Sequence, residues 1–266
     1  MRITSIIIAT TLLLSLFFNR VEAQVNRFQS GEKLTYGVYY YLMGVWVVAG
    51  DVSFSVESAE HRGKQCLKFI GEGGTHKRYD WFYKVVDRYE SYVNPIDIRP
   101  YRFRRDVSEG DHYFVEDCVF DYSKNAIFSV LKIKEKPLQV DTSTLVDGSF
   151  DVLSMIYHAR NLDYESFEID QKVPINMFID RETHELFIRY LGVDTYKHSE
   201  YGEIECYVFS PLLVNGTLFK SGERMKVYVT KDENVIPIYV ESEIRVGSIR
   251  AELIDYTGLR AKLGAD

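Results

Sequence analysis

Alternation of apolar and polar residues with a period of two dominates this chain. In residues 33–40 the apolar side chains fall on one face of an extended strand: Leu34, Tyr36, Val38 and Tyr40. The pattern recurs in five further sets, namely Val52, Phe54 and Val56; Val173, Ile175, Met177 and Ile179; Met225, Val227 and Val229; Ile238, Val240, Ile244 and Val246; and Ile249, Ala251 and Leu253. One buried and one hydrated face is typical of antiparallel sheets. The pattern therefore predicts a mainly β protein.

Turn-forming segments separate the predicted strands: HRGK, SEGD, KDEN and NGT. A single flat sheet of so many strands would have to curl or close, and no Pro-, Gly- or Ser-rich linker divides the chain. We therefore expect a curled antiparallel sheet or (half-)barrel with one principal helix packed against it. The polar segment 136–149 is predicted to be a loop between two β-rich halves, and the glycine-rich segment around residues 71–74 a turn at a strand end.

Residues 150–161 form the best helix candidate. Their apolar side chains recur at helical spacing: Val152, Leu153, Ile156, Ala159 and, just beyond, Leu162. Ser149 or Asp147 is expected to cap the N-terminus, with Asp151 in the first turn. The apolar stripe predicts that this helix packs on the sheet, with Leu153 and Ile156 buried.

The same helix carries Asp151, Ser154 and His158 at i, i+3 and i+7, which places all three on one face. A serine nucleophile also needs an oxyanion hole, and no Gly-x-Ser-x-Gly elbow surrounds Ser154. The backbone N–H groups around Ser154 are used by the helix itself. We therefore interpret the trio as a capping aspartate, a small packing serine and an exposed or core-edge histidine, and assign no catalytic residue.

The first residues are typical of a secretory signal peptide. Arg2 precedes an apolar run, and residues 21–23 form an A-x-A-like cleavage site. Residues 1–23 are therefore expected to be removed, which leaves 24–266 as a single β-rich domain in the periplasm. No Cys follows the cleavage site, so a lipoprotein is not expected. Charges such as Glu241 and Glu243 on the polar strand faces favour a soluble protein over a membrane barrel.

The formal net charge of −7 argues against nucleic acid or an anionic lipid surface as the main partner. The three cysteines, Cys66, Cys118 and Cys206, form no C-x-x-C pair, and their odd number leaves at least one thiol unpaired within the chain. His184 and Glu185 lack the second histidine of a zincin motif. No phosphate-binding loop is present, and neither a metal nor a cofactor is predicted.

The most basic segment contains Arg99, Arg102, Arg104 and Arg105. On a strand, Arg102 and Arg104 share one face and Arg105 takes the other. Such a pair is able to form an anion or carboxylate site at a barrel mouth. The preferred interpretation is a hydrated strand face balanced by nearby acidic residues, Asp106, Glu109 and Asp111, because runs of charged residues are usually hydrated.

Four segments together resemble a known family: residues 31–54, 83–106, 151–163 and 225–256. In this order they resemble the exported bacterial "domain of unknown function 3108" family. The last segment is the most specific, with Asp232, an Ile-Pro pair and a Val-Gly-Ser-Ile ending, and the helix matches at Asp151, Leu153, Ser154, Tyr157 and Arg160. The resemblance implies a periplasmic, barrel-like protein of a Gram-negative bacterium and transfers no catalytic residue.

A curled sheet with a helix across its opening makes a concave apolar pocket, which favours a protein that binds or carries a hydrophobic small molecule or lipid. Tyr36, Tyr40 and Phe54 are the predicted lining residues, with Arg102 and Arg104 as the candidate polar contacts. Two alternatives stay open: an assembly factor that contacts envelope proteins through a sheet edge, and a glycan or lipid hydrolase whose carboxylate pair the sequence does not single out.

Overall fold

The computed structural model describes residues 26–42, 44–79, 81, 84–214, 221–244 and 247–264. The predicted signal peptide, residues 1–23, lies outside the described residues. The NGT turn segment at 215–217 and the predicted strand residue Val246 lie outside them as well.

Fifteen strands form one continuous sheet. Their bounds are Lys33–Leu42 (β1), Val45–His61 (β2), Lys64–Thr75 (β3), Val85–Val93 (β4), Pro100–Glu109 (β5), His112–Asp121 (β6), Ala126–Ile133 (β7), Gln139–Thr144 (β8), Ser149–Phe150 (β9), Lys172–Ile179 (β10), Glu182–His198 (β11), Gly202–Pro211 (β12), Met225–Thr230 (β13), Pro237–Glu243 (β14) and Ser248–Thr257 (β15). The strand order runs from β8 down to β1, continues with β15 and descends to β9. Neighbours are antiparallel except for the short parallel pair β9–β10.

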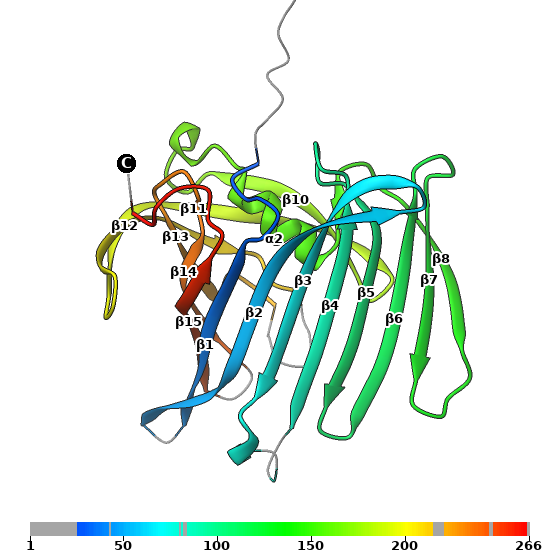
Figure 1. The fold of residues 1–266 in the computed structure, drawn as a ribbon, viewed down its shortest axis with the longest axis horizontal. Coiled ribbons are helices and arrows are strands. Elements are labelled where there is room, and N and C mark those ends of the chain that lie inside the picture. The colour runs from blue at the N-terminus through cyan, green and yellow to red at the C-terminus, as the bar shows by residue number, and fades with distance from the viewer. Residues whose placement is uncertain are drawn as a thin grey trace, which may run out of the picture.

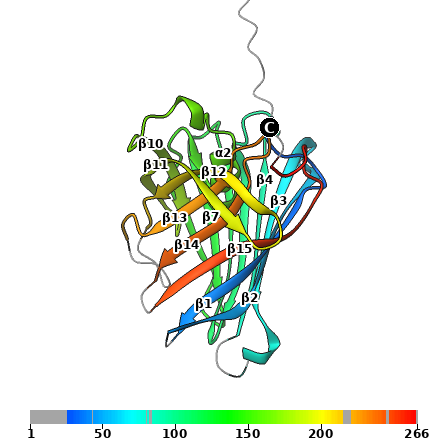
Figure 2. The same ribbon diagram turned by 90° about the vertical axis from the view of Figure 1, so that its left-hand side faces the viewer.

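The sheet is strongly curled and holds one α-helix among the described residues, α2 (Val152–Arg160). Strands β1 to β8 form a broad curved wall, and β10 and β11 cross behind it near α2 (Figure 1). The view of the curled side shows β13, β14 and β15 leading into β1 and β2 (Figure 2). Because β8 and β9 remain at the two ends of the strand order, the sheet is not closed. The predicted fold class is thus confirmed.

The turn between β10 and β11 reaches across the concave side of the wall. Arg105, which shares a face of β5 with buried residues, pairs with Asp180 in this turn. The Ser143 hydroxyl donates to the carbonyl of Arg181 at 2.8 Å, and the Arg181 guanidinium donates to Gln139 Oε1 at 3.2 Å. These contacts tie the returning half of the sheet to β5 and β8.

Two segment predictions were wrong. The segment 136–149 is not all loop, because it contains β8 and Ser149, the first residue of β9. Strand β8 is an edge strand exposed almost throughout, so burial does not impose an apolar alternation on it. Gly71, predicted in a turn, lies inside β3. A Cβ atom at Gly71 would stand 3.1 Å from Leu153 Cδ2, so this glycine allows α2 to approach the sheet closely.

Candidate functional site: an apolar cavity under helix α2

Helix α2 begins at Asp151, which caps it. The Asp151 carboxylate Oδ1 accepts hydrogen bonds from the backbone N–H groups of Leu153 at 2.9 Å and Ser154 at 3.0 Å. The Ser91 hydroxyl of β4 donates to Asp151 Oδ2 at 2.5 Å. The predicted caps Ser149 and Asp147 were therefore wrong. The preceding residue, Phe150, belongs to β9, so the extended chain turns into the helix only at residue 151.

Asp151 is completely buried. This burial raises the pKa of its carboxyl to about 6, although the hydrogen bonds from Ser91 and the backbone act in the opposite direction. The capping carboxylate therefore titrates closer to neutral pH than an exposed aspartate.

The three polar residues of α2 do not form a catalytic triad. The Ser154 hydroxyl donates to the backbone carbonyl of Asp151 at 3.2 Å, and the Ser154 side chain is buried. The His158 ring stacks on Phe150 with 4.3 Å between centroids, and burial lowers the pKa of this imidazole. Ser154 is thus a packing residue inside the helix, and His158 lies at the edge of the core.

The inner faces of the curled sheet and of α2 surround a cavity of about 550 Å³. Its lining comes from α2 and from strands on both sides of the β1–β15 pair. The lining residues include Tyr36, Phe54, Met155, Ile156, Met177, Val227 and Ala251. Leu153, on the neighbouring face of α2, packs into the core with Phe69 and Tyr157 instead. Apolar side chains from almost every surrounding element therefore form the wall.

Few polar groups reach the lining, and most are satisfied inside the protein. The Tyr36 hydroxyl donates to the carbonyl of Pro237 at 2.9 Å. Arg160 is neutralised by an ion pair with Glu32 at 2.5 Å. The covered Tyr157 hydroxyl has no hydrogen-bond partner among the described residues. The cavity therefore offers hydrocarbon surface and carries no unpaired charge among its described lining residues.

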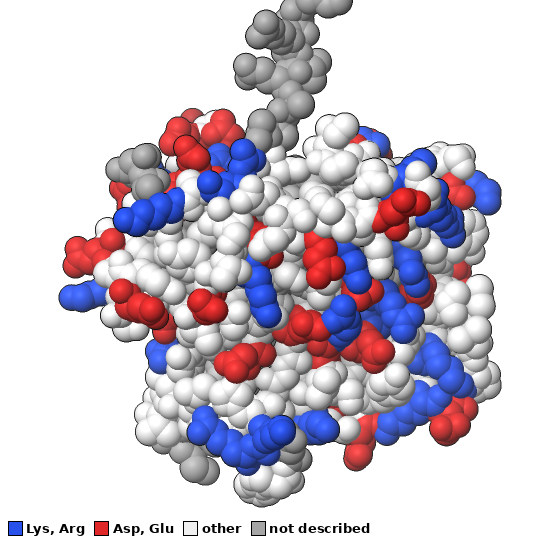
Figure 3. Space-filling view, viewed as in Figure 1, with Lys and Arg blue, Asp and Glu red and all other residues white. Residues whose placement is uncertain are grey.

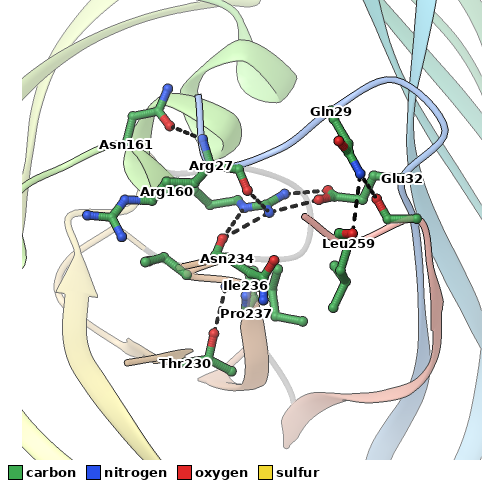
Figure 4. Close-up of polar contacts among 12 residues, drawn as sticks. Arg27, Gln29, Glu32, Arg160, Asn161, Thr230, Asn234, Ile236, Pro237 and Leu259 are labelled. Carbon is green, nitrogen blue, oxygen red and sulfur yellow. Dashed lines mark hydrogen bonds and ion pairs between the residues drawn. The ribbon is translucent and has the colours of Figure 1, made fainter. Parts of the chain in front are cut away.

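Arg160, the last residue of α2, is the centre of a buried polar network (Figure 4). Its guanidinium contacts both carboxylate oxygens of Glu32, which precedes β1. It also donates to the carbonyl of Asn234 at 3.0 Å and to that of Arg27 at 3.3 Å. Arg160 thereby joins the C-terminal end of α2, the segment before β1 and the β13–β14 turn.

The β13–β14 turn owes its shape to Asp232. Asp232 Oδ1 accepts hydrogen bonds from the backbone N–H groups of Asn234 at 2.9 Å and Val235 at 3.0 Å, and from the Thr230 hydroxyl at 2.7 Å. This local geometry presents the Asn234 carbonyl to Arg160. The turn is therefore part of the support for α2 rather than an independent site.

The predicted site residues do not lie together. Tyr36 and Phe54 line the cavity, with 6.0 Å between their ring centroids, whereas Tyr40 is not among the lining residues. Arg102 forms a two-point contact with Asp117 on the adjacent strand. Arg104 also pairs with Asp117, at 3.6 Å. Whether any of these five residues binds a ligand stays a prediction.

Sequence reasoning missed the importance of Arg160, Glu32 and Arg105. Arg105 is buried and pairs with Glu116 at 2.7 Å as well as with Asp180. Glu32 and Arg160 are far apart in the chain, so spacing gives no signal of their contact. The alternation within β5 was the only available signal for Arg105, since it separates this residue from Arg102 and Arg104.

Three further features of the described residues concern metal ligands, thiols and helix length. No group of three or more His, Cys, Asp or Glu residues is arranged to hold a metal ion in this part of the chain. All three cysteines are free and buried. Over the same described ranges, no helix combines the length and apolarity that a membrane crossing requires.

The fold and the cavity together define a β-barrel-like protein with an apolar internal site. A family model described as "Protein of unknown function (DUF3108)" matches residues 35–254, and the chain belongs to this family. The family resemblance stated from the sequence is thereby confirmed. No curated protein matches the chain.

A solved structure has a similar fold. It is the crystal structure of a beta-barrel-like protein of domain of unknown function DUF1849 from Brucella abortus. The TM-score is 0.56 at 8% sequence identity, and the similarity covers 87% of this chain and 98% of the other. At this identity the comparison supports the barrel-like architecture alone.

Proposed function

We propose that this protein binds the hydrocarbon part of a lipid-like molecule in the cavity under α2 and carries it in the periplasm. The observation that supports this proposal is the apolar cavity of about 550 Å³. Its volume lies within the roughly 300–1,000 Å³ of known small-molecule sites. An apolar cavity gives water few hydrogen-bond partners, so a hydrocarbon chain is the better occupant.

The chemistry of the wall selects the class of ligand. The Arg160 charge is already matched by Glu32, and the Tyr36 hydroxyl already donates to a backbone carbonyl. A ligand carboxylate placed inside the cavity would lose its hydration and would find no unpaired cation to compensate for that loss. The charged or polar end of the ligand is therefore expected to remain outside the cavity.

Uptake of a long-chain fluorescent fatty-acid probe by the purified protein tests the binding proposal. Ala251→Phe adds a ring to the cavity lining and is expected to weaken uptake about tenfold or more. Ile254→Phe adds bulk to the same strand at a half-exposed position on its other face, and is expected to leave uptake unchanged. Native mass spectrometry after gentle extraction would detect a ligand that copurifies.

Failure of the wild-type protein both to take up the probe and to carry a bound mass would reject the carrier function. The assembly-factor hypothesis would then be preferred. The periplasmic location has its own test, because N-terminal sequencing of protein released from the periplasm is expected to begin at Gln24. A full-length product in the cytoplasm would contradict it.

A further inference from the structure

Two neighbouring hairpin ends of the curved wall carry large aromatic side chains that solvent reaches. The β1–β2 end contributes the exposed Tyr41 and the half-buried Trp46, whose ring centroids lie 5.1 Å apart, and the β3–β4 connection contributes Trp81, which is 83 % exposed. Trp46 and Trp81 are the only tryptophans in the sequence. Exposed aromatic side chains on two adjoining hairpin ends mark an interaction surface.

The two hairpin ends are joined by hydrogen bonds, so their side chains belong to one surface. The backbone N–H of His76 donates to the carbonyl of Ala49 at 3.0 Å. The guanidinium of Arg78, in the short 3₁₀ helix Lys77–Tyr79, donates to the carbonyl of Val48 at 3.1 Å. The β3–β4 connection therefore lies against β2 close to Trp46.

The same hairpin ends carry basic side chains. Lys77, Arg78 and Lys84 are exposed in the β3–β4 connection. The guanidinium carbon of Arg250 lies 4.5 Å from the ring centroid of Trp46. On the face shown in Figure 3, Lys and Arg side chains gather along the lower edge, where the β1–β2 and β3–β4 hairpins end in Figure 1. This local surface is basic although the whole chain is acidic.

We propose that this surface, defined as Tyr41, Trp46, Lys77, Arg78, Trp81 and Lys84, docks on an anionic lipid bilayer. Tryptophan and tyrosine are enriched where a protein meets the headgroup region, because each ring combines an apolar body with a polar atom. Lysine and arginine side chains beside them are attracted to lipid phosphates. Docking of this surface on a bilayer does not require a ligand in the cavity.

The basic residues favour a bilayer over a protein partner. Tryptophan, tyrosine and arginine are common in protein interfaces, but lysine is depleted there. Lys77 and Lys84 are both exposed in the connection that holds Trp81. Lipid phosphates supply a counterion to each lysine and do not require a partner of complementary shape. Charge complementarity therefore favours a bilayer as the occupant of this surface.

Vesicle flotation tests the proposal with two compositions, phosphatidylcholine alone and phosphatidylcholine mixed with phosphatidylglycerol. We expect the wild-type protein to bind the anionic vesicles at low ionic strength and to be released by salt. Trp81→Ser is expected to weaken binding about tenfold. Lys77→Glu with Arg78→Glu is expected to weaken it by about fivefold or more per residue.

The control variant changes an equally exposed apolar side chain at the other end of β4. Ile96→Ser, in the β4–β5 connection at 69 % exposure, is expected to bind vesicles like wild type. A Trp46→Phe variant retains Trp81 as its only tryptophan, and its emission is expected to shift to shorter wavelength on binding. Circular dichroism confirms that each variant is folded.

Three outcomes would overturn the proposal. The folded wild-type protein does not bind anionic vesicles at low salt, or Trp81→Ser and the double charge reversal bind as well as wild type. In the third outcome, wild type does not bind vesicles but forms a concentration-dependent dimer in size-exclusion chromatography, and Trp81→Ser abolishes that dimer. The occupant of this surface would then be a second copy of the chain.

Discussion

Arg160 illustrates how single polar residues stabilise this fold. Its guanidinium is buried, and so is the carboxylate of Glu32 with which it pairs. Two charges removed from water lose much hydration, and the pair is stable only because each group finds close partners. The backbone carbonyls of Arg27 and Asn234 supply further acceptors to the guanidinium. Removal of one partner would leave the other charged and buried without compensation.

We therefore expect Arg160→Ala to lower the free energy of unfolding by about 3–5 kcal/mol. The matched control is Arg224→Ala, because Arg224 pairs with Glu243 at 2.7 Å on the exposed surface. Loss of an exposed pair is expected to cost only about 0–1 kcal/mol. Urea unfolding followed by tryptophan fluorescence measures both, and equal losses in the two variants would contradict the structural role of Arg160.

Asp151 makes stability depend on pH. Burial raises its pKa to about 6 in the folded protein, so the folded state binds this proton more tightly than the unfolded chain. The stabilisation from proton binding is present at low pH and is lost as the pH rises from about 4 to about 6. Asp151→Asn keeps an acceptor for the helix N-terminus but does not titrate.

Between pH 4 and pH 7 the stability of wild type relative to Asp151→Asn is therefore expected to fall by roughly 2.4 kcal/mol, since each pKa unit corresponds to about 1.4 kcal/mol. Urea unfolding of both proteins across this pH range provides the measurement. Parallel stability curves for the two proteins would show that Asp151 does not titrate in this range.

At the scale of elements, α2 is fixed by close packing on β3 and β4. Leu153 is almost completely buried. A Cβ atom on residue 71 would stand 3.1 Å from Leu153 Cδ2, so a residue larger than Gly71 would crowd the leucine. Ser91 of β4 holds the helix start through Asp151. The helix therefore contacts the sheet through a small residue on one strand and a hydrogen bond on the next.

Leu153→Ala is expected to cost about 2–5 kcal/mol of stability, because it leaves a void in a packed core. Leu138→Ala removes the same atoms from an exposed leucine and should change stability by less than about 0.5 kcal/mol. Thermal and urea unfolding compare the two variants. A similar small loss in both would mean that α2 is loosely packed.

The alternation of side chains predicted the elements well wherever one strand face is buried. Tyr36, Phe54, Met177, Val227 and Ala251 were all assigned to apolar strand faces, and all line the cavity. Strand β8 was missed because solvent reaches both of its faces, so its sequence carries no alternation. The start of α2 was misplaced because several residues before it are able to cap a helix.

The supporting network of the cavity was not predictable in the same way. Glu32, Arg160 and Asn234 come from three distant segments, and only the folded sheet brings them together. The net charge of the whole chain is negative, so it gave no signal of the basic side chains at Lys77 and Arg78. Local patterns determine which face of a strand is buried, but contacts between distant residues depend on the curl of the sheet.

At the scale of the whole molecule, the proposed binding of a ligand in the cavity predicts a change in stability. A ligand that binds only the folded state at about 100 times its Kd stabilises that state by about 2.7 kcal/mol. We expect a long-chain probe at this concentration to raise the unfolding temperature of wild type and not that of Ala251→Phe. Differential scanning calorimetry measures the shift, and an equal shift in both proteins would place the ligand outside the cavity.

The pairing of β1 with β15 also has a consequence for how the protein folds. Most neighbouring strands of the sheet follow one another in the chain and are able to form as hairpins, but this pair joins Lys33 to Thr257. Closing so long a loop costs more chain entropy than closing a hairpin, and contacts between distant residues slow folding. We therefore expect the β1–β15 contact to form last, which leaves the unpaired edges of both halves open to aggregation until the end of the chain arrives.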